Sequence, residues 1–364
     1  MLIDWPRIHE TRGISLGAMS LAPFSFAYGL GVRVNMAIRS KIRSKALPGF
    51  VVSIGNITAG GTGKTPAACM LAEWAKRQGY KVAVLLRGYG RESKEKVLEV
   101  SDGNAINASP REAGDEAVLI AKRVEGVPVV VSKNRYLAGL WAHNRYGANF
   151  FILDDAFQHV ALERHMDVVL LDASSPFGNG HLLPWGPLRE PIAHLKRADV
   201  FIITRIGNRR SDSKSETREL LAREFPGKPL FESEHVPKKA FFPAEKKEYD
   251  PKLLNGKRAF AFAGIARPEA FKETLLQLGV QIAGFRSFND HHAFSRREIE
   301  ELLSAKDKKR ADFLLTTEKD WVRIESLGAR FHGLGYLAIA FRFLSGFDEF
   351  TSLIKGKAGA QLSV

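Results

Sequence analysis

The stretch that most constrains the fold is FVVSIGNITAGGTGKT, which runs from Phe50 to Thr65. An apolar run breaks here into a glycine-rich loop that ends in Gly-Lys-Thr. Such a loop after a buried strand is typical of phosphate binding, because glycines allow backbone N–H groups to turn toward an anion. The nucleotide-binding residues predicted from this loop are Gly60, Gly61, Thr62, Gly63, Lys64 and Thr65.

Two side chains of this loop have predicted roles in the chemistry. Lys64 is expected to face solvent until it neutralises the β and γ phosphates of ATP, and Thr65 has the hydroxyl expected on Mg²⁺. A helix is expected to begin near Pro66 and to point the positive end of its dipole at the same phosphates. The strict phosphate-loop pattern asks for glycine at position 58, where this sequence has Thr58. A plain glycine-rich turn therefore remains the alternative.

The composition indicates a folded protein with an anionic partner. The chain has 364 residues, of which 45% are hydrophobic, so it can bury a sizeable core and is long enough for two domains. The single cysteine, Cys69, excludes an intrachain disulfide and fits a reducing compartment. A net charge of +14 predicts binding to nucleic acid, an acidic membrane or a phosphorylated substrate. No RNA- or DNA-binding module appears in the sequence, so nucleic acid is not the expected partner.

Residues 1–45 form a predicted membrane-associating arm. No charged residue occurs between Gly13 and Val32, and five basic residues follow, namely Arg33, Arg39, Lys41, Arg43 and Lys45. Glycines and Pro23 make the apolar run a poor transmembrane helix, and the acidic residues before it argue against a signal peptide. An apolar and basic segment suits the surface of an anionic membrane. A helix packed on its own domain is the alternative, because amphipathic patterning serves both.

Short apolar runs after the loop predict the rest of a sheet. They cover residues 81–86, 127–131, 150–153, 168–171 and 200–203. Strands that are apolar throughout and alternate with helical patterns indicate a mostly parallel α/β sheet with helices on both faces, as in phosphate-loop NTPases. Functional residues gather at the carboxyl ends of such strands. In this chain those ends carry Asp154, Asp155, Asp172 and Arg205.

The sequence predicts two domains. A polar segment over residues 211–218, expected to be a loop, and the prolines that follow it place a boundary near residue 228. Residues 1–228 would form the phosphate-loop domain, and residues 229–364 a smaller α/β domain. The second domain has predicted strands over 258–265, 280–288, 312–317 and 336–341, and a predicted helix over 268–278. Ser295 and Glu298 form a capping box at the start of a further helix.

Two polar segments are candidates for chemistry. Asp154 and Asp155 follow a buried strand, which is how the magnesium-supporting acid of a phosphate-loop enzyme is delivered. A solvated turn is the alternative for this acidic pair. Residues 289–292, with the sequence Asn-Asp-His-His, lie between a strand and the capped helix. A metal site there lacks further ligands at suitable spacing, so a structural loop remains an alternative.

Seven motifs occur in order along the chain, namely GNITAGGTGKTP, LLRGYGR, EAGDE, LDDAFQH, PLREP, SFNDHH and TTEKD. In this combination they resemble the tetraacyldisaccharide 4'-kinase family of lipid A biosynthesis, from the N-terminal arm to about Arg323. The resemblance implies a two-domain enzyme, peripheral on the cytoplasmic face of the inner membrane, whose C-terminal domain closes over the active site. It would transfer the γ-phosphate of ATP, with Mg²⁺, to the 4'-hydroxyl of an acylated glucosamine disaccharide.

The resemblance also implies roles for individual residues. Asp115 resembles the catalytic base and His291 the histidine paired with it across the domain cleft, with Lys64 as the third catalytic residue. The implied magnesium contacts are Thr65, Glu116, Asp154 and Glu190. The implied substrate-binding residues are Arg87, Arg135, Asp154, Asp155, Gln158, His159 and Arg189. Ala156 stands where the family usually has glycine, and an alanine would be strained there if the turn needs positive φ.

The main alternative is a membrane-associated phosphate-loop ATPase switch of the partition or positioning type. Those proteins carry a lysine immediately before the double glycine, and this sequence has Ala59 at that place. A response of ATP turnover to an acylated disaccharide would discriminate the kinase from the switch.

Overall fold

The computed structural model describes residues 20–41, 43–206, 211–328 and 330–362. Contacts divide them into two compact units. The first unit contains the described residues up to Arg87, Val130–Glu234 and those from Arg342 onward, and the second contains Gly88–Val129 and His235–Phe341. Residues 88–129 thus group with the C-terminal part of the chain. The boundary near residue 228 stays a prediction about separately folding domains.

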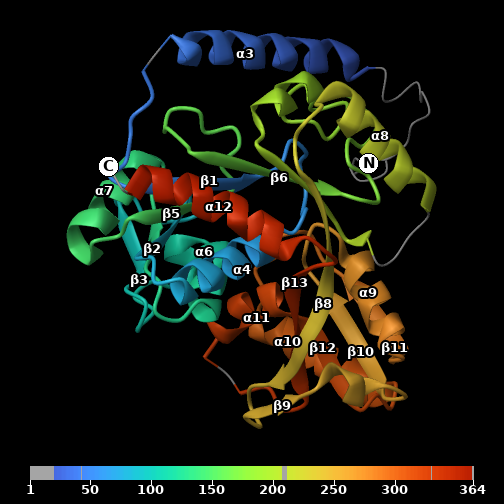
Figure 1. The fold of residues 1–364 in the computed structure, drawn as a ribbon. Helices are drawn as coiled ribbons and strands as arrows, with labels where there is room; N and C mark the ends of the chain where they lie inside the picture. Colours follow the sequence, from blue (N-terminus) through green and yellow to red (C-terminus); the bar gives the residue numbers. More distant parts are fainter. Residues whose placement is uncertain (1–19, 42, 207–210, 329, 363–364) are drawn as a thin grey trace. The chain divides into compact units, whose positions relative to one another are not determined.

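The first unit is built on a mostly parallel sheet (Figure 1). Its strands are β1 (Phe50–Gly55), β2 (Val82–Leu86), β4 (Val129–Val131), β5 (Phe150–Asp154), β6 (Met166–Asp172), β7 (Val200–Thr204) and the start of β8 (Leu230–Phe242). Their order is β8-β7-β6-β1-β5-β2-β4, with β1 parallel to both β5 and β6. Strands β1, β2, β5, β6 and β7 are buried throughout. The predicted parallel α/β fold is therefore confirmed in this unit.

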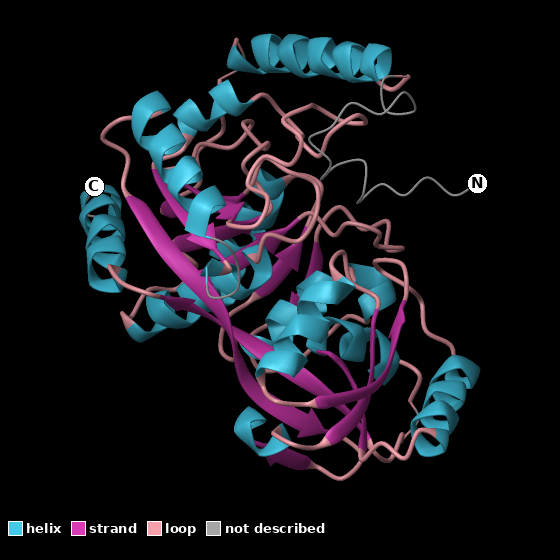
Figure 2. Ribbon diagram, turned by 90° about the vertical axis from the view of Figure 1, so that its right-hand side faces the viewer, coloured by secondary structure: helices cyan, strands magenta, loops and turns pink. Residues whose placement is uncertain are grey.

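Helices pack on the strands of this sheet. They are α4 (Lys64–Arg77), α7 (Arg135–Tyr146), the 3₁₀ helix η1 (Ile192–Arg197), α8 (Ser211–Glu224) and α12 (Phe347–Leu362). A separate helix, α3 (Ala22–Ser40), lies at the top of both views (Figure 1, Figure 2). Helix α4 packs on β1, β2 and β5 through a buried apolar face, and α12 contacts β1. Since α4 starts directly after the glycine-rich loop, its packing holds that loop at the carboxyl end of β1.

The loop predicted over residues 211–218 is wrong, because α8 begins there. Thr217, Leu221 and Phe225 recur every four residues and are all buried. Leu221 and Phe225 pack in a core cluster with residues of β6 and β7. A helix needs only one apolar stripe to be held in place, so a segment of polar composition can still be helical.

The second unit has a smaller sheet of its own. Its strands are the end of β8, β9 (Lys247–Tyr249), β10 (Arg258–Ala263), β11 (Gln281–Ser287), β12 (Phe313–Thr317) and β13 (Leu334–Phe343). Strand β3 (Leu98–Ser101) also belongs to the second unit but is not part of this sheet, because its neighbour in the strand order is β4. The order is β11-β10-β12-β13-β8, parallel from β11 to β13, and β9 pairs antiparallel with β8. The helices are α5 (Pro110–Ala113), α6 (Asp115–Arg123), η3 (Pro251–Leu254), α9 (Pro268–Gln277), α10 (Arg296–Lys308) and α11 (Glu318–Glu325).

Alternating side chains of β10 explain how both faces of this sheet are covered. Ala259, Ala261 and Ala263 pack with Phe271 of α9, whereas Phe262 packs with residues of α10 and α11. Successive residues of a strand point to opposite faces, so small residues admit one helix closely and aromatic residues fill the other side. The predicted strands at 258–265, 280–288, 312–317 and 336–341 are confirmed with shifted ends, and so is the capping box of α10.

The predicted membrane-associating arm lies partly outside the described residues, which begin at residue 20. In the described part it forms α3. Within the described ranges, no helix combines the length and apolar character that crossing a bilayer requires.

Candidate active site

The glycine-rich loop has the backbone that phosphate binding needs. Gly60 has φ 107° and Gly63 has φ 87°, a region that residues with a Cβ adopt only with strain. Thr58 has no positive φ, and its carbonyl and hydroxyl oxygens accept bonds from Asn56 Nδ2 at 2.8 and 3.3 Å. The missing glycine at this position is therefore accommodated without a left-handed residue.

Lys64 is held in place by two acceptors. Its Nζ lies 3.2 Å from Asn56 Oδ1 and 3.5 Å from Asp155 Oδ1. The side chain is only 12% exposed, so the expectation that it faces solvent is wrong. Because the contacts to Asn56 and Asp155 fix the ammonium group beforehand, little reorganisation is needed when an anion arrives.

The acidic pair at the end of β5 has two distinct roles. Thr65 Oγ1 donates to Asp154 Oδ2 at 3.5 Å. Asp155 receives Arg189 Nη1 at 2.9 and 3.0 Å on its two oxygens. Burial raises the pKa of Asp155, but the charges of Lys64 and Arg189 outweigh burial and hold the pKa below its ordinary value. Asp155 therefore stays ionised between two cations.

The turn after β5 accommodates the alanine that departs from the family pattern. Its left-handed residue is Asp155, with φ 49°, whereas Ala156 has no positive φ and is fully buried. Aspartate tolerates the left-handed region better than most residues. The strain considered for Ala156 therefore does not arise.

Gln158 and Glu190 form a buried network behind the phosphate loop. Gln158 Nε2 donates to the carbonyl of Asn56 at 2.8 Å and to Glu190 Oε1 at 2.7 Å. The carboxylate of Glu190, only 2% exposed, also lies 2.8 Å from His194 Nδ1 and 2.8 Å from Arg197 Nη2. A direct magnesium role for Glu190 would require it to give up these bonds, and that role stays a prediction.

Two arginines predicted to bind substrate, Arg87 and Arg135, lie close enough that the charge of one lowers the pKa of the other. Arg135 begins α7 and is buried. Burial and the nearby charge of Arg87 lower its pKa to about 10, while Asp155 and Asp154 oppose the shift. His159 lies in the turn that follows β5, where its amide donates to the carbonyl of Ala156 at 2.8 Å. These groups share a region of the first unit with Lys64 and Arg189.

Thr65 and Asp154 fit a magnesium ion. A hydroxyl beside a carboxylate supplies the oxygen ligands that Mg²⁺ prefers. No group of three or more His, Cys, Asp or Glu side chains arranged to hold a metal occurs in the part of the chain that the structure describes. Magnesium in phosphate-loop proteins is bound through one or two protein oxygens plus substrate phosphates, so the pair is sufficient. Glu116, the fourth predicted ligand, belongs to the second unit.

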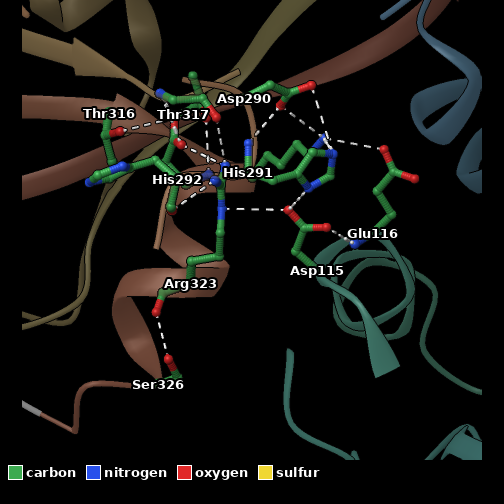
Figure 3. Close-up of polar contacts among 12 residues, drawn as sticks. Asp115, Glu116, Asp290, His291, His292, Thr316, Thr317, Arg323 and Ser326 are labelled. Atoms are coloured by element: carbon green, nitrogen blue, oxygen red, sulfur yellow. Dashed lines mark hydrogen bonds and ion pairs between the residues drawn. The ribbon is translucent and has the colours of Figure 1, made fainter. Parts of the chain in front are cut away.

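The predicted base and histidine meet in the second unit (Figure 3). His291 Nδ1 lies 3.0 Å from Asp115 Oδ2. Asp115 is buried at the start of α6, after Gly114 with φ 93°. The boundary predicted near residue 228 separates the two residues, whereas their contacts place both in one compact unit.

The pKa values of Asp115 and His291 are shifted in opposite directions. Burial raises the pKa of Asp115, but the bond from His291 and the charges of Lys319 and Arg323 outweigh burial and lower it below 3.8. The bond to Asp115 raises the pKa of His291 above 6.5, against burial and the charge of Lys319. The stabilisation by Asp115 is lost as pH falls through its lowered pKa, and that by His291 is lost as pH rises through its raised pKa. The pair is therefore most stabilising between these two values.

Two residues of α11 contact this pair, namely Lys319 and Arg323, and neither had a role predicted from the sequence. Lys319 Nζ lies 3.2 Å from Glu116 Oε1 and 3.4 Å from His291 Nε2. Arg323 lies 3.5 Å from Asp115 Oδ2 and donates to the carbonyls of His292 and Gly264. Lys319 and Asp320 belong to the TTEKD motif and Arg323 follows it, so the motif was the available signal.

Asp320 fixes the position of Arg323 through a set of buried hydrogen bonds. Its buried carboxylate accepts from the amide of Gly264 at 3.1 Å, from Thr317 Oγ1 at 2.6 Å and from Arg323 Nη2 at 2.7 Å. Replacing Asp320 by alanine should destabilise the protein by about 3 kcal/mol, because Arg323 loses its buried partner. Urea unfolding measures this change. Asp307→Ala, which removes an exposed partner of Lys306, should change stability by less than about 0.5 kcal/mol, and an equal loss in both variants would contradict the prediction.

Comparison with known proteins identifies the relatives of this chain. Residues 17–357 match the model of the tetraacyldisaccharide-1-P 4'-kinase family, LpxK. The tetraacyldisaccharide 4'-kinase of Syntrophus aciditrophicus is 42% identical over 315 residues, which cover 84% of each chain. That of Desulfatibacillum aliphaticivorans is 37% identical over 359 residues, or 96% of this chain and 94% of the relative.

A solved structure is similar over almost the whole chain. It is LpxK from Aquifex aeolicus in complex with ATP, with a TM-score of 0.74 and 29% sequence identity, covering 94% of this chain and all of that one. The fold, the family match and the curated relatives agree, and this chain belongs to the tetraacyldisaccharide-1-P 4'-kinase family.

Proposed function

We propose that this protein transfers the γ-phosphate of ATP to the 4'-hydroxyl of a tetraacyldisaccharide 1-phosphate, a step of lipid A biosynthesis. The observation that carries the proposal is the preset ammonium group of Lys64, held by Asn56 and Asp155 beside a loop with left-handed glycines. Phosphoryl transfer depends on placed positive charge more than on covalent chemistry. The names of the relatives support the choice of acceptor, and the relative crystallised with ATP supports the choice of donor.

The residues of the first unit would bind the phosphates. Backbone N–H groups of the loop and Lys64 would neutralise the β and γ phosphates, and Arg189 would hold Asp155 in the ionised form. Thr65 and Asp154 would hold Mg²⁺, which when bound neutralises the charge that develops on the phosphates. The network through Gln158 and Glu190 would keep Asn56, and through it Lys64, in position.

The residues of the second unit would activate the acceptor. The carboxylate of Asp115 would accept the proton of the sugar hydroxyl, and His291 would orient this carboxylate or receive the proton. The helix N-terminus and nearby cations make Asp115 a weak base by itself. The bonded imidazole, with its raised pKa, supplies the stronger proton acceptor of the pair.

The test is to supply γ-labelled ATP with the acylated disaccharide 1-phosphate, and to ask which molecule carries the label. Label on the disaccharide supports the kinase assignment. ATP hydrolysis that leaves the lipid unlabelled would indicate the ATPase switch instead. Adding nucleic acid in a parallel reaction checks that it does not stimulate turnover.

We also propose that α3 rests on an anionic membrane surface, at the cytoplasmic face of the inner membrane. Leu30, Val34 and Ile38 are 54%, 50% and 56% exposed and follow one stripe of the helix. The opposite face holds α3 on the first unit, where Ser25 Oγ donates to the carbonyl of Leu182 at 2.8 Å. A helix that buries small residues and exposes large apolar ones, with Arg33 and Lys41 exposed beside them, suits an acidic lipid surface.

Replacing Leu30, Val34 and Ile38 together by serine should weaken binding to anionic vesicles by about 100-fold, since each partly inserted side chain contributes about 1 kcal/mol. The substitution leaves the contacts of Ser25 intact, which deletion of residues 1–45 would remove. Vesicle flotation at low and high salt measures the effect, because attraction of basic residues to the surface weakens with salt. Leu137→Ser, at an exposed leucine of α7, is the control, and unchanged flotation of the triple variant would contradict the assignment.

A further inference from the structure

Lys319 lies against the ring of His291 on the side away from Asp115. It follows Thr317, whose Oγ1 accepts the amide of Asp320 and caps α11. Its Nζ is 3.4 Å from His291 Nε2, 3.2 Å from Glu116 Oε1 and 3.6 Å from Asp290 Oδ1. The first turn of α11 therefore directs one ammonium group to the remaining ring nitrogen of the predicted catalytic histidine.

The two ring nitrogens of His291 face groups of opposite hydrogen-bonding character. A lysine ammonium group has three donors and no acceptor, so it needs a lone pair on Nε2. The ionised carboxylate of Asp115 only accepts, so it needs a proton on Nδ1. Both contacts are satisfied by the same neutral tautomer, which has its proton on Nδ1.

We propose that Lys319 is a positioning residue, which keeps Nε2 of His291 free of a proton while Asp115 holds the proton on Nδ1. The other charged groups around the ring make this control necessary. Asp290 Oδ2 lies 3.8 Å from Nε2 and favours a proton there. Lys319 neutralises Asp290 and Glu116 while offering its own donors to the ring. Arg323 faces Asp115, and the ring of Tyr89 is 6.2 Å away, so neither competes for Nε2.

This positioning role rests on the proposed function. With the proton on Nδ1, the imidazole fixes Oδ2 of Asp115, and Nε2 keeps the lone pair that a proton relay requires. Without Lys319, Asp290 would be the nearest charged neighbour of Nε2 and would favour a second ring proton on that nitrogen. His291 would then be an imidazolium, which keeps its Nδ1 bond to Asp115 but has no lone pair on Nε2 with which to take up a proton.

The chain contains a matched control on the same two helices. Lys122 of α6 pairs with Glu325 of α11, just as Lys319 of α11 pairs with Glu116 of α6. The charges and helices are the same in both pairs, but the structure records no contact between Lys122 and His291. A change seen with Lys319 and not with Lys122 is therefore specific to the histidine.

The experiment compares the full-length wild type with Lys319→Met, Lys319→Arg and Lys122→Met. The ring nitrogens of His291, labelled with ¹⁵N and assigned with a His291→Gln variant, report the tautomer, and kcat and KM are measured for ATP and the acylated disaccharide. We expect a proton on Nδ1 alone in the wild type and on both ring nitrogens in Lys319→Met, with kcat lowered about 10-fold and KM little changed. Lys319→Arg should restore the spectrum and most of kcat, because it keeps the charge and donors, and Lys122→Met should match the wild type.

An unchanged His291 spectrum in Lys319→Met, or a wild-type proton on Nε2, would overturn the proposal. A newly protonated Nε2 with unchanged kcat would overturn the positioning role in catalysis. If the wild type transfers no phosphate to the lipid, the proposed function fails, and the ring spectra still decide whether Lys319 keeps Nε2 free of a proton.

Discussion

Replacing Lys64 by alanine is expected to lower kcat by about 100-fold or more while the protein stays folded. The lost charge would stabilise the phosphates most strongly in the transition state, where preset groups act without reorganising. Asp155 keeps Arg189 as a partner at 2.9 Å, so no buried carboxylate is left unpaired. The measurement is kcat with ATP and the acylated disaccharide, together with the free energy of unfolding in urea.

The control for Lys64 is Lys76→Ala. Lys76 is an exposed lysine in the last turn of the same helix, so it reports any general effect of removing a positive charge from α4. Near wild-type turnover by folded Lys64→Ala would exclude the phosphate-loop assignment. A loss of stability greater than about 2 kcal/mol would instead show that the contacts to Asn56 and Asp155 are needed for folding.

Asp115→Ala and His291→Ala are each expected to lower kcat/KM by roughly 10²–10⁴-fold, the range of general acid–base catalysis. The double variant should be little worse than the poorer single variant, since residues that act as one unit lose activity non-additively. Their 3.0 Å contact is the physical basis of this expectation. The measurement is kcat/KM for the wild type, both single variants and the double variant at saturating Mg²⁺.

His292→Gln is the control for the histidine loop. His292 follows His291 directly, but its Nε2 pairs with Glu298 at 2.9 Å instead of with Asp115. We expect this variant to keep most of the activity, because the capping box of α10 still orders the end of the loop. If the losses of Asp115→Ala and His291→Ala multiply in the double variant, the two residues act independently and the pairing is wrong.

Local sequence was enough to predict the phosphate loop and most of the elements. The segment from Phe50 to Thr65 is contiguous in sequence. Its glycines therefore predict the backbone conformation of the loop, and Lys64 and Thr65 predict its phosphate and magnesium contacts. Buried strands and the capping box at Ser295 also depend on neighbours close in sequence. By contrast, α8 was missed, because its helical stripe becomes apparent only when Leu221 and Phe225 meet β6 and β7.

Tertiary structure alone decided how the predicted site residues are partnered. The family resemblance implied that Asp115 and His291 work together, but only the fold shows both in one unit and adds Lys319 and Arg323. Likewise, Glu190 is one of several plausible acids in the sequence, and only the fold surrounds it with Gln158, His194 and Arg197. Hydrogen bonds and ion pairs act over a few ångströms, and folding brings to that distance residues that lie far apart in the chain. Asp115 and His291, for example, are 176 positions apart. The sequence therefore indicates the chemical groups that each residue offers, but not which residues become neighbours. The partners that set the charge and orientation of Asp115 and His291 are determined by the packing of α6, the His291 loop and α11.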